Sequence, residues 1–135
     1  MRVLVTGAAG YIGRIVAREL ARDHQVRGLD MRPMPELADA RVLDLNDYEA
    51  VREALKGVEA VAHLAWPIRQ YQGIQPGEST DLGAGVRGLY QLLRATVAEG
   101  IQRFVFQSTI NVTWPSWDNW RVTEDEQPRP GLSGY

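Results

Sequence analysis

The sequence predicts an α/β fold in which a doubly wound parallel sheet of five strands carries helices on both faces. Short apolar runs with strand character alternate along the chain with longer amphipathic stretches of helical period, and this alternation is typical of parallel sheets. The first apolar run, Val3–Val5, leads through a glycine-rich turn directly into the first helical stretch. The length of 135 residues and a hydrophobic fraction of 44% fit an ordinary globular domain. We therefore expect one domain across residues 1–135.

The glycine-rich turn at residues 5–13, Val-Thr-Gly-Ala-Ala-Gly-Tyr-Ile-Gly, carries the first functional signal. A sharp turn requires residues without a Cβ atom, and a pyrophosphate must approach the backbone closely. The helix that follows offers unpaired N–H groups and a partial positive charge at its N-terminus. Strand, glycine turn and helix in this order favour a dinucleotide phosphate site over a turn that binds no ligand. The predicted site residues in this segment are Gly7, Gly10, Tyr11, Ile12 and Gly13.

A carboxylate ends the second predicted strand, at residues 25–30. Asp30 lies 20 positions after Gly10, where a dinucleotide fold places the acid that accepts hydrogen bonds from the ribose hydroxyls. A carboxylate there repels a 2′-phosphate and favours NAD, whereas Arg32, two residues further on, would pair with that phosphate in NADP. We therefore predict NAD as the cofactor and NADP as the less favoured alternative.

The remaining helices and strands are predicted from the spacing of hydrophobic residues, and their ends from the positions of glycine and proline. The segment 31–40 has two prolines and no period, which predicts a loop. Asn46 precedes a helical stretch that runs to about Lys56, and it is the predicted N-cap. We expect the other helices at residues 11–23 and 81–99, and the strands at residues 2–5, 25–30, 41–45, 58–64 and 103–107. The apolar residues on one side of the long helix are Leu82, Val86, Leu89, Leu92, Leu93 and Val97.

Asp44 and Leu45 end the third predicted strand and are assigned to the cofactor site. Ligands of open parallel sheets bind beside the carboxyl ends of the strands, so Asp44 would accept a hydrogen bond from the adenine amino group. The spacing fits an aspartate that caps the next helix equally well. Both interpretations of Asp44 stay open from the sequence.

Composition and charge exclude several classes of function. A net charge of −2 gives no reason to expect nucleic acid or an anionic membrane as a partner. The longest apolar stretch, Val58–Trp66, is interrupted by polar side chains and is too short to span a bilayer. The chain has no cysteine, which excludes disulfides and suits a reducing compartment. Since the first strand begins at Arg2 and leaves no room for a leader, we expect a cytoplasmic protein. No metal site is predicted.

His63 lies within the fourth predicted strand, whose nearly continuous apolar sequence is typical of a strand covered on both faces. A histidine in such a strand is more commonly packed in the core than catalytic, so we predict a structural role for it. The segment from Trp66 to Thr80, which follows, is long, polar and contains glycine and proline. This composition is typical of a loop that covers a site.

Further motifs follow the fourth and fifth strands. His-Leu-Ala stands at residues 63–65, and Ser-Thr-x-x-Val stands at residues 108–112. Together with Asp30, Asp44 and the turn at residues 6–13, whose glycines occupy every third position, these motifs resemble the extended short-chain dehydrogenase/reductase family. This family is also called the NAD-dependent epimerase/dehydratase family. The resemblance spans the whole chain and implies a Rossmann fold, with Leu64 and Ala65 in the cofactor site.

The resemblance also implies two catalytic residues. Thr109 matches the catalytic Ser/Thr of the family, whose hydroxyl hydrogen-bonds the substrate oxygen that becomes, or ceases to be, a carbonyl. Tyr135 matches the tyrosine of a Tyr-x-x-x-Lys motif, since the proline-rich approach at residues 127–134 resembles that of the family. The family's lysine, which helps to bring the phenol pKa from about 10 toward neutral pH, is not in the sequence. The alternative, that Tyr135 is an unrelated tyrosine, stays open.

The function implied by the resemblance is hydride transfer between NAD and an alcohol carbon of a sugar, sugar acid or nucleotide sugar. Such a protein is an oxidoreductase or an epimerase. Ile110-Asn111 stands where dehydratases of the family have Asp-Glu, which argues against dehydration. The residues around Ser108 and Gly88–Tyr90 resemble uronate dehydrogenases. The alternative is a truncated or degenerate module that binds the dinucleotide without turnover.

Two features predict that the 135 residues belong to a longer chain and stop before its substrate domain. In this topology the strand at residues 103–107 should pair with a sixth strand, and without one it is a bare apolar edge. The family builds its substrate domain mostly from C-terminal sequence. By the same resemblance we expect a homodimer through the helix at residues 81–99 and a helix that begins near Tyr135.

Overall fold

The computed structural model describes residues 1–66, 80–109, 123 and 125. In this described part, five strands form one sheet in the order β3-β2-β1-β4-β5, and all neighbouring strands run parallel. The predicted doubly wound α/β fold is confirmed. The strands are β1 (Arg2–Thr6), β2 (Gln25–Asp30), β3 (Asp39–Val42), β4 (Ala60–His63) and β5 (Arg103–Phe106), and the helices are α1 (Tyr11–Leu20), α2 (Tyr48–Leu55) and α3 (Thr80–Ala98).

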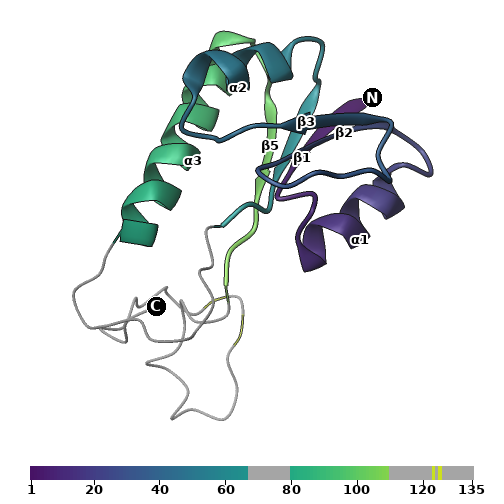
Figure 1. Cartoon of the computed structure of the whole chain (residues 1–135), viewed down its shortest axis with the longest axis horizontal. Helices are drawn as coiled ribbons and strands as arrows, with labels where there is room; N and C mark the ends of the chain where they lie inside the picture. The colour runs from purple at the N-terminus through teal and green to yellow at the C-terminus, as the bar shows by residue number, and fades with distance from the viewer. Residues whose placement is uncertain (67–79, 110–122, 124, 126–135) are drawn as a thin grey trace.

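The helices cover the two faces of the sheet, with α1 on one face and α2 and α3 together on the other (Figure 1). Side chains of β1 alternate between these faces, as the pleat of a strand requires. Leu4 packs with α2 and α3, whereas its neighbours Val3 and Val5 pack on the side of α1. The larger core, beneath α2 and α3, comprises Leu4, Leu29, Val51, Ala54, Leu55, Val58, Val61, Leu92 and Ala95.

The strand order creates a switch point between β1 and β4. The chain runs outward from β1 to β2 and β3, crosses back to β4, and continues outward to β5. Open α/β sheets bind ligands in the crevice outside the carboxyl ends of the strands at such a point. Thr6 and His63, the last residues of β1 and β4, are register partners at this position. The fold therefore locates a candidate site beside these two residues.

Strand β3 begins at Asp39, two residues before the predicted strand at residues 41–45, so that prediction is wrong. The cause is a contact between side chains distant in the sequence. Arg27 Nε in β2 donates to Asp39 Oδ2 at 2.8 Å, and the two residues are register partners. This ion pair fixes where the third strand joins the sheet.

Element ends also differ from the predictions. Helix α1 ends at Leu20 rather than at residue 23. The N-cap of α2 is Asp47, whose Oδ1 accepts from the backbone N–H of Ala50 at 3.1 Å, so the predicted cap Asn46 is wrong. Gly57 adopts a φ of 72°, a left-handed conformation that suits glycine and turns the chain from α2 toward β4. Strand β4 is consequently shorter than the predicted segment 58–64.

Helix α3 buries only part of its predicted apolar side. Leu92 is fully buried, and Gly88 approaches Leu45 so closely that an added Cβ would lie 3.0 Å from Leu45 Cβ. The packed face is therefore centred on Gly88 and Leu92, and other apolar residues point away from the core. The side chain of Leu82 lies outside the described residues. The exposed apolar stripe of α3 comprises Val86, Tyr90, Leu93 and Val97, which are between 40% and 78% exposed.

Strand β5 forms one edge of the sheet within the described residues. It pairs with β4 on one side, and its residues Val105 and Phe106 are 66% and 47% exposed. This arrangement agrees with the bare apolar edge expected for the fifth strand. The segment 67–79, predicted to be a covering loop, lies outside the described residues.

Arg27 joins β2, β3 and the end of α2. Its side chain is nearly buried. Besides the ion pair with Asp39, its Nη1 donates to the backbone carbonyls of Ala54 at 2.7 Å and Lys56 at 3.0 Å. The last carbonyls of a helix have no partner within the helix, and this guanidinium supplies one. Arg27 therefore anchors α2 to the sheet edge that carries β3.

We expect Arg27→Met to lower the free energy of unfolding by about 3 kcal/mol, because it removes a nearly buried guanidinium from its ion pair with Asp39 and leaves the carbonyls of Ala54 and Lys56 without their partner. Urea denaturation measures this change. Arg41→Met is the matched control, since Arg41 pairs with the same Asp39 from an exposed position and should cost less than about 1 kcal/mol. Equal losses in the two variants would contradict the anchoring role of Arg27.

Candidate functional site

The glycine turn between β1 and α1 leaves no room for side chains. Gly7 adopts a φ of 69°, and an added Cβ would lie 2.8 Å from the backbone nitrogen and Cα of Ala65. The N–H of Gly10 donates to the carbonyl of Gly7 at 2.8 Å and closes the turn. Both backbone conformation and space therefore require glycine at position 7, and this requirement brings Leu64 and Ala65 against the turn.

Gly13 and Gly10 let the first turn of α1 lie on the glycine turn itself. An added Cβ would lie 2.0 Å from the Gly7 carbonyl oxygen at Gly13, and 2.9 Å from it at Gly10. The close contacts at Gly13 are with the backbone of Gly7 and Ala8.

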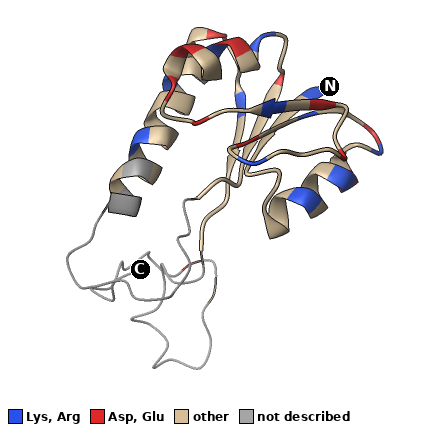
Figure 2. Cartoon of the chain, viewed as in Figure 1, with Lys and Arg blue, Asp and Glu red and all other residues tan. Residues whose placement is uncertain are grey.

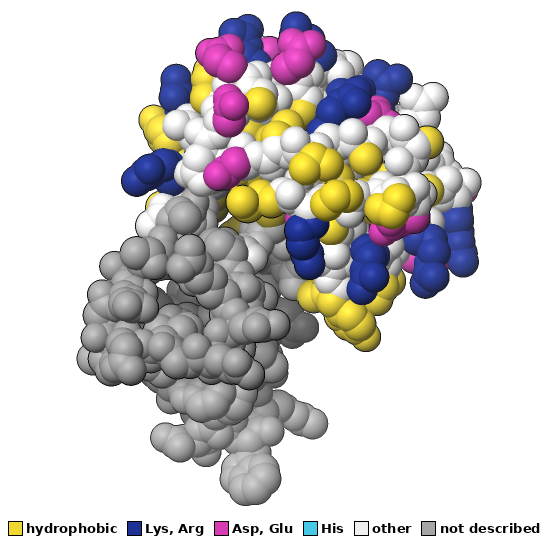
Figure 3. All heavy atoms as spheres, in the orientation of Figure 1, with side chains coloured by type: hydrophobic (Ala, Val, Ile, Leu, Met, Phe, Trp, Pro, Cys, Tyr) yellow, Lys and Arg dark blue, Asp and Glu magenta, His cyan; other side chains and the backbone are white. Residues whose placement is uncertain are grey.

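The N-terminus of α1 is open to solvent. Gly10, the N-cap, offers no side chain to the helix, and the first turn of α1, which the structure describes in full, contains no acidic residue. Tyr11 and Ile12 are exposed, and Figure 3 shows hydrophobic side chains gathered on the surface at the start of α1. The N–H groups of a first helical turn lack helical partners and attract anions. The geometry thus suits a phosphate group at this end of α1.

Asp30 connects the carboxyl end of β2 to the glycine turn. Its Oδ2 accepts from the backbone N–H of Ala9 at 3.0 Å, and its Oδ1 accepts from the backbone N–H of Arg32 at 3.0 Å. The Nε of Arg32 lies 3.3 Å from the same Oδ1. The structure therefore brings the predicted ribose-binding acid and the predicted phosphate-binding turn into direct contact.

Thr6 is a site residue that the sequence analysis missed. Its Oγ1 accepts from the backbone N–H groups of Leu64 and Ala65, each at 3.2 Å, and lies 2.7 Å from Nδ1 of His63. Because the two N–H groups occupy the lone pairs of the hydroxyl oxygen, the hydroxyl proton points to Nδ1. Thr6 thereby fixes the backbone that passes closest to Gly7. Only the contact between β1 and β4 could have revealed this role.

His63 is packed in the core, as its sequence context predicts. Its ring stacks on Phe106 with centroids 5.4 Å apart, and its side chain is buried. Burial lowers the pKa of His63 to about 4, because a charged imidazolium loses its hydration there. The ring is therefore neutral at physiological pH, with Nδ1 accepting from Thr6 and the proton on Nε2.

Asp44 and Leu45 lie in the turn between β3 and α2. Asp44 Oδ1 accepts from the backbone N–H and the Nδ2 of Asn46, at 2.9 and 2.8 Å. Leu45 packs beneath Gly88 of α3. These contacts hold the turn before α2, and because the N-cap of α2 is Asp47, the capping alternative for Asp44 is wrong. The roles of both residues toward a cofactor stay predictions.

The structure describes one of the two predicted catalytic residues. Thr109 lies just after β5, is exposed, and follows the carboxyl end of the strand. It is therefore on the same edge of the sheet as the glycine turn. Tyr135 lies outside the described residues.

The described residues contain neither a metal-binding cluster nor a membrane-spanning helix. Among residues 1–66, 80–109, 123 and 125, no three His, Cys, Asp or Glu side chains gather closely enough to hold a metal ion. None of the helices in this part of the chain has the length and hydropathy of a membrane span.

The residues present fit a dinucleotide. The glycine turn and the uncapped N-terminus of α1 form a cradle whose backbone N–H groups can receive a pyrophosphate. The carboxylate that accepts from Ala9 stands beside this cradle, where the neighbouring ribose would lie. Fold and site together define an α/β protein that binds dinucleotides.

Comparison with known proteins gives the family. The sequence profile of the NAD dependent epimerase/dehydratase family matches residues 3–129. The chain belongs to this family. The resemblance inferred from the motifs is confirmed, and the NAD dependence of the family agrees with the cofactor predicted from Asp30.

The similar proteins are dehydrogenases or members of the short-chain dehydrogenase/reductase superfamily. The chain is 36% identical over 113 residues to L-arabinose 1-dehydrogenase (NAD(P)(+)) of Haloferax volcanii, covering 82% of this chain and 42% of that protein. A short-chain dehydrogenase/reductase superfamily protein of Agrobacterium tumefaciens, solved with bound NAD, is 36% identical with a TM-score of 0.82, covering 97% and 40%. Uronate dehydrogenase of Agrobacterium tumefaciens is 33% identical with a TM-score of 0.69, covering 82% and 41%. The chain thus spans about two fifths of the length of these relatives.

We expect Gly13→Ala to lower the free energy of unfolding by about 2 kcal/mol, because the new methyl group would overlap the Gly7 carbonyl and force the turn apart. Urea denaturation measures the loss, and a weaker affinity for NAD should accompany it. Gly83→Ala is the control, since no described atom lies within 4 Å of its added Cβ and alanine favours a helix by up to about 1 kcal/mol. A stable Gly13→Ala variant would contradict the described turn.

The buried neutral His63 predicts a pH dependence of stability. Its folded pKa of about 4 lies below the unfolded value of 6.5, so the unfolded chain binds more protons between these values. The stabilisation is complete above pH 6.5 and is lost as the pH falls toward 4, by about 2 kcal/mol between pH 7 and pH 5. His63→Asn should remove this part of the pH profile measured by urea denaturation. His24→Asn should keep it, and an unchanged profile in His63→Asn would refute the prediction.

Proposed function

We propose that this chain is the cofactor-binding part of a NAD-dependent dehydrogenase or epimerase that acts on an alcohol carbon of a sugar, sugar acid or nucleotide sugar. The observation that carries the proposal is the contact between the glycine turn and Asp30. This contact supports one continuous surface for the pyrophosphate and the adenosine ribose. Membership of the NAD dependent epimerase/dehydratase family supports the reaction class.

In this proposal the N–H groups of Tyr11, Ile12 and Gly13 hold the pyrophosphate, and Asp30 accepts hydrogen bonds from the ribose hydroxyls. Leu64 and Ala65 line the crevice next to the turn. Bound NAD supplies the acceptor for the hydride that leaves the substrate carbon. The protein's own task at this end is to fix the position of the dinucleotide.

Thr109 and Tyr135 carry the chemistry at the other end of the cofactor. The Thr109 hydroxyl would hydrogen-bond the substrate oxygen, and the exposed position of Thr109 after β5 supports this. The Tyr135 phenolate would take the hydroxyl proton while the C–H bond gives up its hydride, which leaves a carbonyl. A phenol of ordinary pKa is a weak base at neutral pH, so we propose that a cation supplied beyond the described residues lowers the pKa of Tyr135.

The substrate class rests on relatives. L-Arabinose 1-dehydrogenase and uronate dehydrogenase are named for a sugar and a sugar acid. We infer that this chain works on the same chemical class. The exposed edge of β5 and the greater length of the relatives support a longer chain, in which a further strand covers β5 and a substrate domain completes the site. A cytoplasmic location remains our expectation.

The second candidate is a module that binds the dinucleotide without turnover. The observation behind it is that the contact between the glycine turn and Asp30 supports NAD binding by itself and contains no group for the chemical step. Both candidates require NAD binding, and only the first requires substrate oxidation.

We also propose a homodimer through α3. The exposed stripe Val86, Tyr90, Leu93 and Val97 repeats at helical spacing and lies on the side of α3 turned away from the core. Apolar rows of this kind are buried when two helices pack against each other. A second copy of the same helix would cover the stripe.

We expect the full-length protein to reduce NAD in the presence of an aldose, uronate or nucleotide sugar. Thr109→Ala and Tyr135→Phe should each lower kcat by about 100-fold or more, because each removes a proton-handling group, while NAD affinity stays within about twofold. Absorbance of NADH measures turnover and calorimetry measures affinity. NAD binding without turnover on any of these sugars would instead favour the binding module.

Disrupting the proposed dimer interface should halve the mass of the particle in solution. We expect Leu93→Glu to convert the dimer to a monomer in sedimentation velocity, because the interface would bury an unpaired carboxylate. Val42→Glu places the same charge on an exposed apolar residue of β3 and should leave the dimer intact. A wild-type protein that sediments as a monomer at micromolar concentration would contradict the proposed interface.

A further inference from the structure

The Asn46 side chain, in the turn between β3 and α2, holds the Asp44 carboxylate in one orientation. Asp44 Oδ1 accepts from the backbone N–H of Asn46 at 2.9 Å and from its Nδ2 at 2.8 Å. A carboxylate oxygen has about two lone-pair positions, so Oδ1 is fully used. Within the part of the chain that the structure describes, Oδ2 of Asp44 has no hydrogen-bond partner. Oδ2 is therefore the oxygen that Asp44 presents to a ligand.

The carbonyl half of the Asn46 amide is left without a partner. Its Oδ1 is buried and accepts no hydrogen bond from the described residues. Turning the amide over would bring Oδ1 against Asp44 Oδ1, and two acceptors at hydrogen-bond distance repel each other. A buried acceptor without a donor costs free energy, and such groups are rare in native proteins. The contact of Nδ2 with Asp44 is thus the interaction that sets the orientation of this amide.

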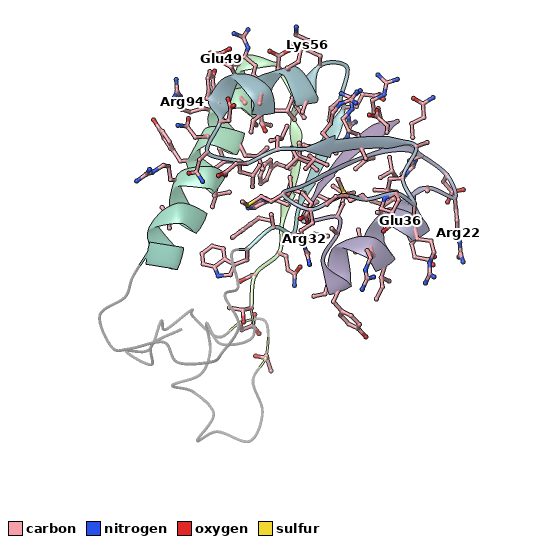
Figure 4. The ribbon with its side chains drawn as sticks, viewed as in Figure 1. Arg22, Arg32, Glu36, Glu49, Lys56 and Arg94 are labelled. Atoms are coloured by element: carbon pink, nitrogen blue, oxygen red, sulfur yellow. The ribbon has the colours of Figure 1, made fainter. Side chains whose placement is uncertain are left out.

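The backbone on both sides of Asp44 is anchored by contacts of its own. Leu43 and Leu45 pack against the larger core beneath α2 and α3. The guanidinium of Arg94, on α3, lies 4.4 Å from the centroid of the Tyr48 ring at the start of α2 (Figure 4). Loss of the asparagine amide would therefore free the carboxylate to rotate and leave its backbone in place.

The surroundings of Asp44 favour a ligand group that donates hydrogen bonds. The N–H of Leu43 donates to the carbonyl of Asp30 at 3.1 Å, so Asp44 lies beside the end of β2. Its side chain is exposed, and Figure 2 shows further acidic residues on the turn into α2 and on α2 itself. Negative charge attracts the positive end of an N–H group and repels a carbonyl oxygen. The exocyclic amino group of adenine is a donor of this kind.

Adenine and hypoxanthine differ in where they donate. Adenine donates from its exocyclic amino group and accepts at N1, whereas hypoxanthine has a carbonyl oxygen in place of the amino group and donates from N1–H. A carboxylate that rotates freely follows the donor of either base. A carboxylate held in one orientation serves only one of them. The orientation of the acceptor therefore decides how well the two bases are distinguished.

We propose that Asn46 is a positioning residue that fixes Asp44 Oδ2 toward the adenine amino group and so makes the site select adenine over hypoxanthine dinucleotides. Asn46 does not touch the cofactor in this arrangement and acts through Asp44. A carboxylate that is already oriented also loses little conformational freedom when the ligand binds. This inference rests on the proposed function and on the predicted contact between Asp44 and adenine.

The test is calorimetric binding of NAD and of nicotinamide hypoxanthine dinucleotide to the purified full-length protein. Wild-type protein should bind NAD about tenfold or more tightly than the hypoxanthine dinucleotide, the size of one hydrogen bond to a charged group. Asn46→Ala should lower this ratio to about threefold or less, because the freed carboxylate turns to N1–H and the hypoxanthine dinucleotide binds more tightly than to wild type. Damage to the fold would weaken both ligands, so this gain separates a positioning role from a structural one.

Two further variants complete the design. Asp47→Ala is the matched control, because it removes the N-cap of α2 in the same turn. It should lower the Tm and keep the wild-type ratio of affinities. Asp44→Ala should bring the ratio to within about twofold of unity, and adding Asn46→Ala to it should change the ratio by less than about twofold, because Asn46 acts through Asp44.

The outcomes separate this inference from the proposed function. An Asn46→Ala variant that binds the hypoxanthine dinucleotide no more tightly than wild type, or a ratio equal to that of Asp47→Ala, would overturn the role of Asn46 alone. A wild-type ratio near unity, or one that Asp44→Ala leaves unchanged, would contradict the adenine contact of Asp44 and this inference with it. Failure of wild-type protein to bind NAD would contradict the proposed function itself.

Discussion

The close approach of Gly7 to the chain after β4 is the constraint on which the rest of the site depends. Gly7 has a left-handed φ, and no Cβ fits between it and the backbone of Ala65. The Thr6 hydroxyl, adjacent in sequence, holds that same backbone through the N–H groups of Leu64 and Ala65. These two contacts hold the end of β1 against the end of β4, where the strand order reverses. They also set the direction in which α1 leaves the sheet.

This arrangement prepares the binding surface in advance. Asp30 accepts from Ala9, so the acid at the end of β2 and the glycine turn at the end of β1 are held as one unit. A ligand that contacts both need not order the turn, and less binding free energy is lost to ordering the chain. The neutral, buried His63 contributes by accepting a hydrogen bond from the Thr6 hydroxyl without introducing a charge beneath the site. The family to which the chain belongs uses NAD, which suits such a surface.

The sequence predicts well those features of the fold that depend on residues close together in the chain. The boundaries of β2, the start of α1 and the parallel sheet follow from apolar period and the glycine turn, and the structure has them as predicted. The position of β3 depends on Arg27 and Asp39, which are far apart in the chain, and local pattern could not place it. Thr6 was missed for the same reason, because its partners lie at the end of the neighbouring strand β4 and directly after it. The contact between Asp30 and the glycine turn was predictable because the spacing between them is a local signal, and the ribose-binding role of Asp30 stays a prediction.

The most direct test of the account is a crystal structure of the full-length protein with NAD. We predict a pyrophosphate within hydrogen-bond distance of the backbone N–H groups at the start of α1, with both adenosine ribose hydroxyls on Asp30. A dinucleotide bound away from Gly7–Gly13, or a ribose that does not contact Asp30, would contradict it.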